Sequence, residues 1–133
     1  MPYRTEVINQ GTGILRYGSG ILTGAEMIAS ARANKAAEID WTRISHFVLD
    51  LTEVTRFDVS ASDIDQLVSA AKKNSDILAE VHHLAIAAPS DVAYGMSRMF
   101  QAYQALPDLV IQVFRGRAEA DAWLQSVLEV PKS

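Results

Sequence analysis

The fold is decided by the stretch HFVLDL at residues 46–51, a short and nearly continuous apolar run. A run of this length is typical of a strand that is covered on both faces, as in a parallel sheet. From about Ser60 onward, apolar residues recur at three- and four-residue spacing, at Ile64, Leu67 and Ala71. The sequence therefore predicts a buried strand followed by a helix that packs on the sheet.

The same strand–helix unit recurs twice towards the C-terminus. Residues 84–88 (LAIAA) predict a second buried strand, and a helix is expected from Ser90, its cap, to about Leu106. Residues 109–114 (LVIQVF) predict a third strand, which is followed by a helix at 118–128. Because all three apolar runs need cover on both faces, we expect them to be parallel neighbours at the centre of the sheet.

The part of the chain before the central run predicts an antiparallel strand pair and a helix. Residues 3–10 alternate, and a second strand is expected at 13–17 after a glycine-containing reversal. A helix then begins near Thr23, since Glu26 three residues later completes a capping-box pattern. The predicted fold is one α/β domain over residues 1–133, with a mostly parallel sheet, an antiparallel opening pair and the order β-β-α-β-α-β-α-β-α.

Composition narrows the class of protein. The chain has 133 residues, of which 49% are hydrophobic and 21% charged, enough for one core. It has no cysteine, which excludes a disulfide framework and a thiol nucleophile. Its net charge of −4 argues against a nucleic-acid partner. Neither a signal-peptide pattern nor an apolar run of ~20 residues is present, so we expect a cytoplasmic protein with no membrane span.

The element order and the segment VLDLTEVTRFDVSA at residues 48–61 resemble the STAS domain of bacterial anti-sigma-factor antagonists and sulfate-transporter tails. The chain is similar above all to the SpoIIAA-like small bacterial proteins. Three features carry this likeness: the run at 84–88 with its long following helix, the strand ending Val113-Phe114, and the segment EADAWL at 119–124. The resemblance implies a SpoIIAA-like fold and a non-enzymatic protein-interaction or regulatory module.

The resemblance also singles out the turn before the second helix. In antagonists this turn reads Asp-Ser-Ser/Thr-Gly, and its second hydroxyl residue is phosphorylated; that position falls on Ser60. Asp58 keeps the acid of the turn, whereas Val59 and Ala61 stand in place of a hydroxyl residue and a glycine. Ser60 is also a preferred N-cap residue, and Asp63 favours the positive end of the helix. We therefore expect Ser60 to cap the helix, and only the resemblance implies a phosphoacceptor.

The helix expected at 90–106 carries more large apolar side chains than one packed face needs. They are Tyr94, Met96, Met99, Phe100 and Tyr103. Methionine and aromatic side chains suit contacts with a partner or an apolar ligand, although packing between the sheet and a neighbouring element is the alternative. A second copy of the chain is the simplest partner, which predicts a homodimer. The alternative function is binding of a small apolar or lipid-like molecule.

Residues for catalysis or metal binding are few. The glycine-rich segment at 18–24 lacks the pattern of a dinucleotide loop, so we expect a bend or bulge before a capped helix. An enzyme would use the strand-end residues His46, Asp50, Asp58 and His82, but no nucleophile triad or third metal ligand is recognisable. The sequence thus predicts no catalytic residues, no metal and no cofactor.

Overall fold

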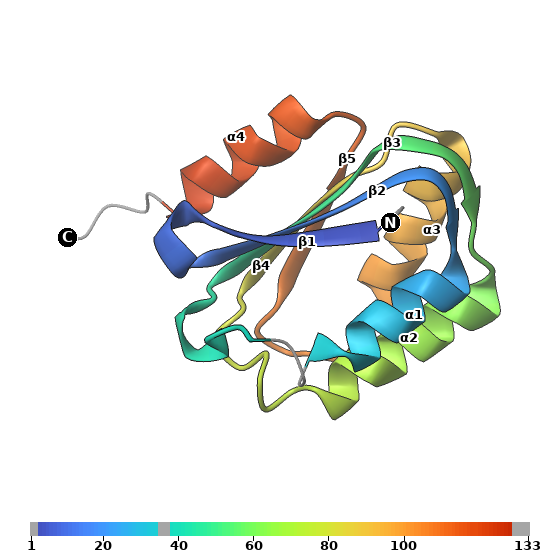
Figure 1. Ribbon diagram of the computed structural model, residues 1–133. Coiled ribbons are helices and arrows are strands. Elements are labelled where there is room, and N and C mark those ends of the chain that lie inside the picture. The colour runs from blue at the N-terminus through green and yellow to red at the C-terminus, as the bar shows by residue number, and fades with distance from the viewer. Residues whose placement is uncertain (1–2, 35–37, 129–133) are drawn as a thin grey trace.

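The computed structural model describes residues 3–34 and 38–128, and its elements follow the predicted alternation (Figure 1). The strands are β1 Tyr3–Ile8, β2 Gly13–Thr23, β3 His46–Asp58, β4 His83–Ala87 and β5 Val110–Phe114. The α-helices are α1 Gly24–Arg32, α2 Ala61–Lys73, α3 Asp91–Tyr103 and α4 Arg117–Leu128. Two short 3-10 helices, η1 Asn9–Gly11 and η3 Trp41–Arg43, lie in connections. The predicted element order is confirmed.

The five strands form one sheet in the order β1-β2-β3-β4-β5. β1 is antiparallel to β2, and the other neighbours are parallel, which confirms the predicted mixed sheet. The prediction that the last strand lies at the centre is wrong, because β5 is an edge strand. Buried Ile111 and Val113 alternate there with exposed Val110 and Gln112, so β5 is covered on one face only along most of its length.

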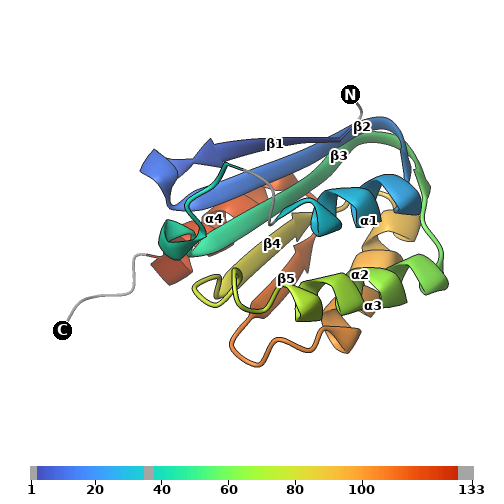
Figure 2. The same ribbon diagram turned by 60° about the horizontal axis from the view of Figure 1, so that its bottom comes forward.

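The helices cover the two faces of the sheet unequally. Helices α1, α2 and α3 lie on one face and α4 lies on the other, as Figures 1 and 2 both show. On the three-helix face, Leu51 and Ile86 belong to the same core cluster as Ile64 of α2. On the other face, Val48 and Ala85 pack with Leu124 of α4. β4 and the first half of β3, residues 46–51, are therefore covered on both faces, which accounts for their continuous apolar sequences.

β2 and β3 are longer than predicted and continue together beyond the rest of the sheet. Residues 19–23 of β2 pair with residues 53–58 of β3, with register shifts between Tyr17 and Ser19 and between Gly20 and Ile21. Gly20 has a φ of +63°, which confirms a bend before the capped helix. The extension of β3 is mostly polar, but Val54 and Phe57 pack against the three-helix core and hold it in place.

The helix boundaries follow from their caps. Thr23 and Glu26 form the predicted capping box of α1, and the Ser90 hydroxyl accepts from the Ala93 N–H at the start of α3. α3 ends at Tyr103, three residues before the predicted end. The Gln104 side chain explains this, because it accepts from the Leu106 N–H and so closes a turn in place of another helical bond.

Candidate functional site

The turn between β3 and α2 presents Ser60 at an exposed helix start. The Ser60 Oγ accepts from the Asp63 N–H at 3.1 Å, and the Asp63 carboxylate accepts from the Ser60 N–H at 2.9 Å. This reciprocal pair confirms the predicted cap. Val59 is buried in the core, whereas Asp58 and Ala61 are exposed. The buried Val59 side chain therefore anchors the turn in the core, and Asp58, Ser60 and Ala61 face solvent.

The five apolar side chains singled out on α3 do not form one surface. Met96 and Phe100 line a cavity between the sheet and the helices, and Met99 packs against the three-helix core. Tyr94 is half-buried, and the Arg115 guanidinium lies 4.2 Å from the centre of its ring. Tyr103 is 56% exposed. Most of these large apolar side chains are therefore covered by other parts of the chain, and only Tyr103 of the five is exposed on the surface.

The cavity lies between the sheet and helices α1, α2 and α3, and its volume is about 140 Å³. Its walls are mainly aliphatic and aromatic. Phe47, Leu49 and Leu84 keep some accessible surface although they lie on middle strands beneath the helices, because they border this space. An apolar cavity of roughly 150 Å³ is large enough to hold a benzene-sized molecule. The space is therefore suited to a small apolar body.

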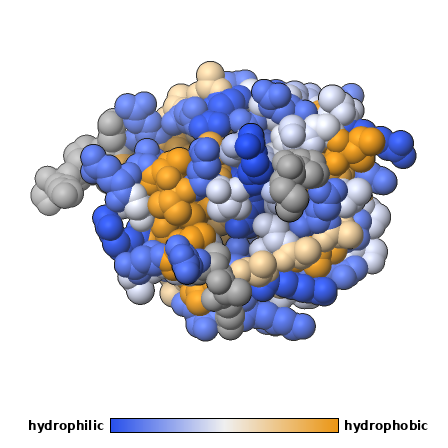
Figure 3. All heavy atoms as spheres, in the orientation of Figure 1, coloured by the Kyte–Doolittle hydropathy of each residue, from blue (hydrophilic) through white to orange (hydrophobic). Residues whose placement is uncertain are grey.

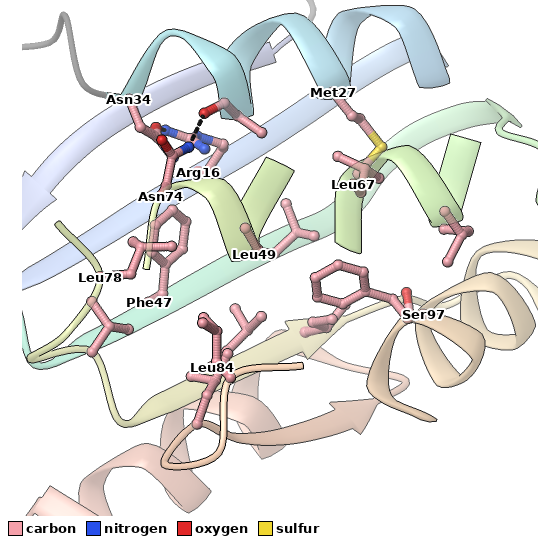
Figure 4. Close-up of a pocket in the computed structure, with 18 of the residues that line it drawn as sticks. Arg16, Met27, Asn34, Phe47, Leu49, Leu67, Asn74, Leu78, Leu84 and Ser97 are labelled. Atoms are coloured by element: carbon pink, nitrogen blue, oxygen red, sulfur yellow. Dashed lines mark hydrogen bonds between the residues drawn. The ribbon is translucent and has the colours of Figure 1, made fainter. Parts of the chain in front are cut away.

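Polar groups gather at one end of the cavity. Figure 4 shows Arg16, Asn34 and Asn74 close together, with Met27 and Ser97 towards the other end. Arg16 comes from β2, Asn34 follows α1, and Asn74 follows α2. All three residues are buried, and Arg16 is only 7% exposed. The cavity is therefore amphipathic, with a charged group and two amides at one end and a mainly apolar wall.

The Arg16 guanidinium is held by neutral groups. Its Nε–H donates to the Thr5 hydroxyl at 2.9 Å, and its Nη2 donates to the Asn34 side-chain oxygen at 2.9 Å. The guanidinium carbon lies 5.0 Å from the ring centre of Phe47 and 5.9 Å from that of Tyr3. Within residues 3–34 and 38–128, no carboxylate forms an ion pair with it. Arg16 thus places a buried positive charge at the cavity without a described counter-charge.

Burial shifts the pKa of both titratable groups at the polar end of the cavity. It lowers the pKa of Arg16, and the nearby Tyr3 opposes the shift only in part. Burial also raises the pKa of Tyr3 to about 12, although Arg16 acts in the opposite direction. Tyr3 is therefore a neutral phenol at physiological pH. The guanidinium still carries its charge there, since arginine is not deprotonated in proteins.

The strand histidines and carboxylates do not converge in one cleft. His46 is the register partner of His83, rather than of His82, and lies on the α4 face. Asp50 accepts from the Thr52 N–H at 2.8 Å and from Arg117 of α4 at 3.0 Å. Burial raises the pKa of Asp50, but the bonds from Thr52 and Arg117 more than offset this and leave the pKa below its usual range. Asp50 is a structural carboxylate that ties β3 to α4.

Asp58 and Asp50 do not form a pair either. Both lie on β3, eight residues apart, which is ~26 Å along an extended strand. In the described part of the chain, no group of three or more His, Asp or Glu side chains is placed to hold a metal ion. None of the helices there has the length and apolar character needed to span a bilayer.

The outer surface carries scattered hydrophobic side chains. Figure 3 shows one face of the molecule, where hydrophobic residues form separate patches bordered by polar ones. The large hydrophobic residues that are exposed belong to five different elements: Val7, Ile21, Val92, Tyr103, Val110 and Leu128. α3 contributes two of them, Val92 and Tyr103, which are eleven residues apart and so lie on one side of the helix.

Sequence reasoning did not single out the polar end of the cavity. Arg16 lies between Leu15 and Tyr17 in a strand, where a charged residue usually faces solvent. The available signal was the alternation in β2, which puts Arg16 on the same face as buried Ile14. Asn34 and Asn74 each follow a helix and gave no separate signal.

Comparison with known proteins identifies the fold. No protein-family model matches the chain, and no curated protein is significantly similar to it in sequence. The chain is similar to an uncharacterized DUF3478-family protein with a SpoIIAA-like fold from Shewanella loihica PV-4, with 18% identity and a TM-score of 0.54 over 92% of this chain and 91% of that one. It is also similar to the anti-sigma factor antagonist SpoIIAA in its unphosphorylated form, with 14% identity and a TM-score of 0.55 over 96% of this chain and 99% of that one. The chain therefore has the SpoIIAA-like α/β fold that its sequence predicts.

Proposed function

We propose that this protein is a non-enzymatic regulatory module of the bacterial cytoplasm whose partner is another protein. The observation that carries this proposal is the SpoIIAA-like fold, since a solved protein of that fold is an anti-sigma factor antagonist. The exposed turn with Asp58, Ser60 and Ala61 supports the same function, because it resembles the turn that is phosphorylated in antagonists. We place the partner contact at this turn.

Ser60 serves this contact as a cap rather than as a phosphoacceptor. Its hydroxyl already accepts from the Asp63 N–H, so the start of α2 is capped without any modification. A phosphate at Ser60 would meet free N–H groups at the start of α2 but would also lie beside Asp58 and Asp63, whose charges repel it. The proposed contact therefore depends on the shape of the turn.

Site-specific crosslinking in cells tests the contact. A photoreactive amino acid at Ala61 should capture a protein that the same amino acid at Ala118 does not. Both alanines are exposed in the first turn of a helix, but Ala118 lies on α4, on the opposite face of the sheet. Equal capture at both positions, or no capture at either, would contradict a partner site at the turn.

The second candidate function is binding of a small apolar ligand, and the cavity of about 140 Å³ favours it. Met96 and Phe100, two residues predicted to contact a ligand, line this space. Native mass spectrometry of the purified protein tests the proposal by looking for a retained small molecule. A mass equal to that of the bare chain, together with no response of cavity residues to added apolar molecules, would contradict it.

Self-association remains a proposal, and the exposed side of α3 supports it through Val92 and Tyr103. Sedimentation of the wild type should then detect a dimer that Tyr103→Glu dissociates. Ala102→Glu is the matched control, because it adds the same charge at an exposed neighbouring position of α3. A wild type that sediments as a monomer at high micromolar concentration would exclude the homodimer.

A further inference from the structure

We infer that the cavity between the sheet and helices α1–α3 binds a small organic acid, whose carboxylate meets Arg16 and whose apolar body lies along Phe47, Leu49 and Leu84. This inference rests on the second candidate function and names the chemical class of the ligand. Its basis is the contrast between a mainly apolar wall and one buried cation at its end.

The charge of Arg16 requires an explanation. Charged side chains are seldom fully buried unless they are paired, because removing a charge from water is costly. The hydrogen-bond partners of Arg16, Thr5 and Asn34, are neutral, and so is the phenol of Tyr3. The described ion pairs of this protein involve Arg115 and Arg117 instead. An anionic group in the cavity would supply the missing counter-charge.

The position of the guanidinium is fixed before any ligand arrives. Two hydrogen bonds fix its plane, and the rings of Phe47 and Tyr3 lie near it. A guanidinium presents several N–H groups in a planar fork that matches the two oxygens of a carboxylate. Because Arg16 is already ordered, a ligand carboxylate binds without the entropic cost of ordering a long side chain.

The neighbouring Asn34 amide adds a neutral donor at the same end. The Asn34 side-chain oxygen accepts from Arg16, so its nitrogen is left as a donor. The Asn74 amide nitrogen donates to the Ala31 carbonyl, which fixes the orientation of that amide. Both side chains lie beside Arg16 in Figure 4. A neutral donor beside a single cation suits an anion rather than a second cation.

The size of the space limits the apolar part of the ligand. At about 140 Å³ the cavity is close to one of roughly 150 Å³ that holds benzene, so a body of about six carbon atoms fits. Hexanoate has six carbon atoms, one of which belongs to its carboxylate, and 1-hexanol has six carbon atoms and a neutral hydroxyl end. These two molecules are therefore the matched probes.

The experiment is an NMR titration of the full chain with hexanoate and with 1-hexanol. The expected result is that both perturb the amides of cavity-lining residues, that hexanoate binds about 10- to 100-fold more tightly, and that only hexanoate shifts the Arg16 Nε–H signal. Arg16→Gln should abolish the preference for hexanoate and retain binding of 1-hexanol. Arg56→Gln, which removes an exposed arginine of β3, should leave the preference unchanged.

The outcomes separate the two proposals. Equal affinity for the two probes, or an unchanged preference in Arg16→Gln, overturns the carboxylate inference and leaves apolar binding intact. No response of the cavity to either probe overturns both. If Arg16→Gln does not fold, the comparison of the two probes on the wild type, read at the Arg16 Nε–H, still decides between these results.

Discussion

The imidazole of His46 lies directly over the bare Cα of Gly13, its register partner on the neighbouring strand. A methyl group on residue 13 would collide with the ring, which cannot move freely because both of its nitrogens are hydrogen-bonded. We therefore expect Gly13→Ala to lower the free energy of unfolding by about 1 to 3 kcal/mol, as overpacking does. Urea denaturation measures this directly.

Gly95→Ala is the matched control for that substitution. Gly95 lies within α3, and a Cβ there meets no neighbouring atom within 4 Å. Alanine is the better helix former, so this variant should be more stable than the wild type by about 0.5 to 1 kcal/mol. Destabilisation by both variants to the same extent would show that the close approach of His46 is not the cause.

His46 also makes stability depend on pH. Asn9 donates to its Nε2 at 2.7 Å, so Nδ1 carries the proton and donates to Ser45 Oγ at 2.9 Å. This arrangement requires the neutral ring. Burial lowers the pKa of His46 below its ordinary value of 6.5, and the nearby His83 lowers it further. The unfolded chain therefore binds a proton at a higher pH than the folded one does.

The sign of the effect follows from linkage. The stabilising contribution of neutral His46 is complete above pH 6.5 and is lost as the pH falls from 6.5 towards the lower pKa of the folded state. Denaturation curves at pH 7.5 and 5.5 should thus show lower stability at pH 5.5. His46→Gln should reduce this difference, and His83→Gln should reduce it separately, since burial and His82 lower the pKa of His83 as well. If the difference in stability between pH 7.5 and 5.5 is unchanged in both variants, the two histidines do not cause it.

The parts of the fold that sequence predicted are those fixed by local patterns. Continuous apolar runs identified the strands, and the hydroxyl–acid pairs Thr23–Glu26 and Ser60–Asp63 identified two helix starts. The long extension of β3 was missed because Thr52 to Arg56 is mostly polar, and only its pairing with β2 shows it to be strand. The edge position of β5 was missed because strand order depends on contacts between distant segments.

The cavity could not be predicted for a related reason. Its walls come from elements far apart in the sequence, such as Tyr3 of β1, Arg16 of β2 and Leu109 before β5. Whether their side chains meet or leave a space depends on packing in three dimensions, which no periodicity records. Apolar residues on α3 were recognised, but the same pattern fits a core, a cavity wall and an outer surface.

The cap of α2 gives a separate stability prediction. Ser60→Ala removes the acceptor of the Asp63 N–H and should lower the free energy of unfolding by about 1 kcal/mol, whereas Ser60→Gly should cost less. Ser62→Ala removes an exposed hydroxyl two residues further along and should have little effect. Chemical denaturation of the three variants checks this, and equal losses at positions 60 and 62 would contradict a specific capping role.

The Asp50–Arg117 pair should stabilise the α4 layer. Asp50→Asn removes the charge that accepts from Arg117 at 3.0 Å, and we expect a loss of about 1 to 2 kcal/mol because the pair is only partly exposed. The pKa of Asp50 is lowered, so its contribution is present above about pH 4 and is lost as the pH falls through the folded-state value. In Asp50→Asn the free energy of unfolding should therefore fall less steeply as the pH is lowered. Glu53→Gln, at an exposed position of β3, is the control and should alter neither quantity.

Filling the cavity should stabilise the ligand-free protein. Leu84 lies on β4 and borders the space, so Leu84→Phe places additional carbon atoms where the wild type has none. Added dispersion contacts should raise the free energy of unfolding by about 0.5 to 2 kcal/mol, the range seen for cavity-filling changes. The same variant should no longer bind hexanoate or 1-hexanol, because their apolar body needs that volume.

Leu128→Phe is the control for this prediction. It makes the same chemical change at a position that is 41% exposed and should alter neither stability nor binding. Thermal unfolding and the NMR titration measure the two effects on one sample, and a Leu84→Phe protein that is destabilised yet still binds both probes would show that they bind elsewhere.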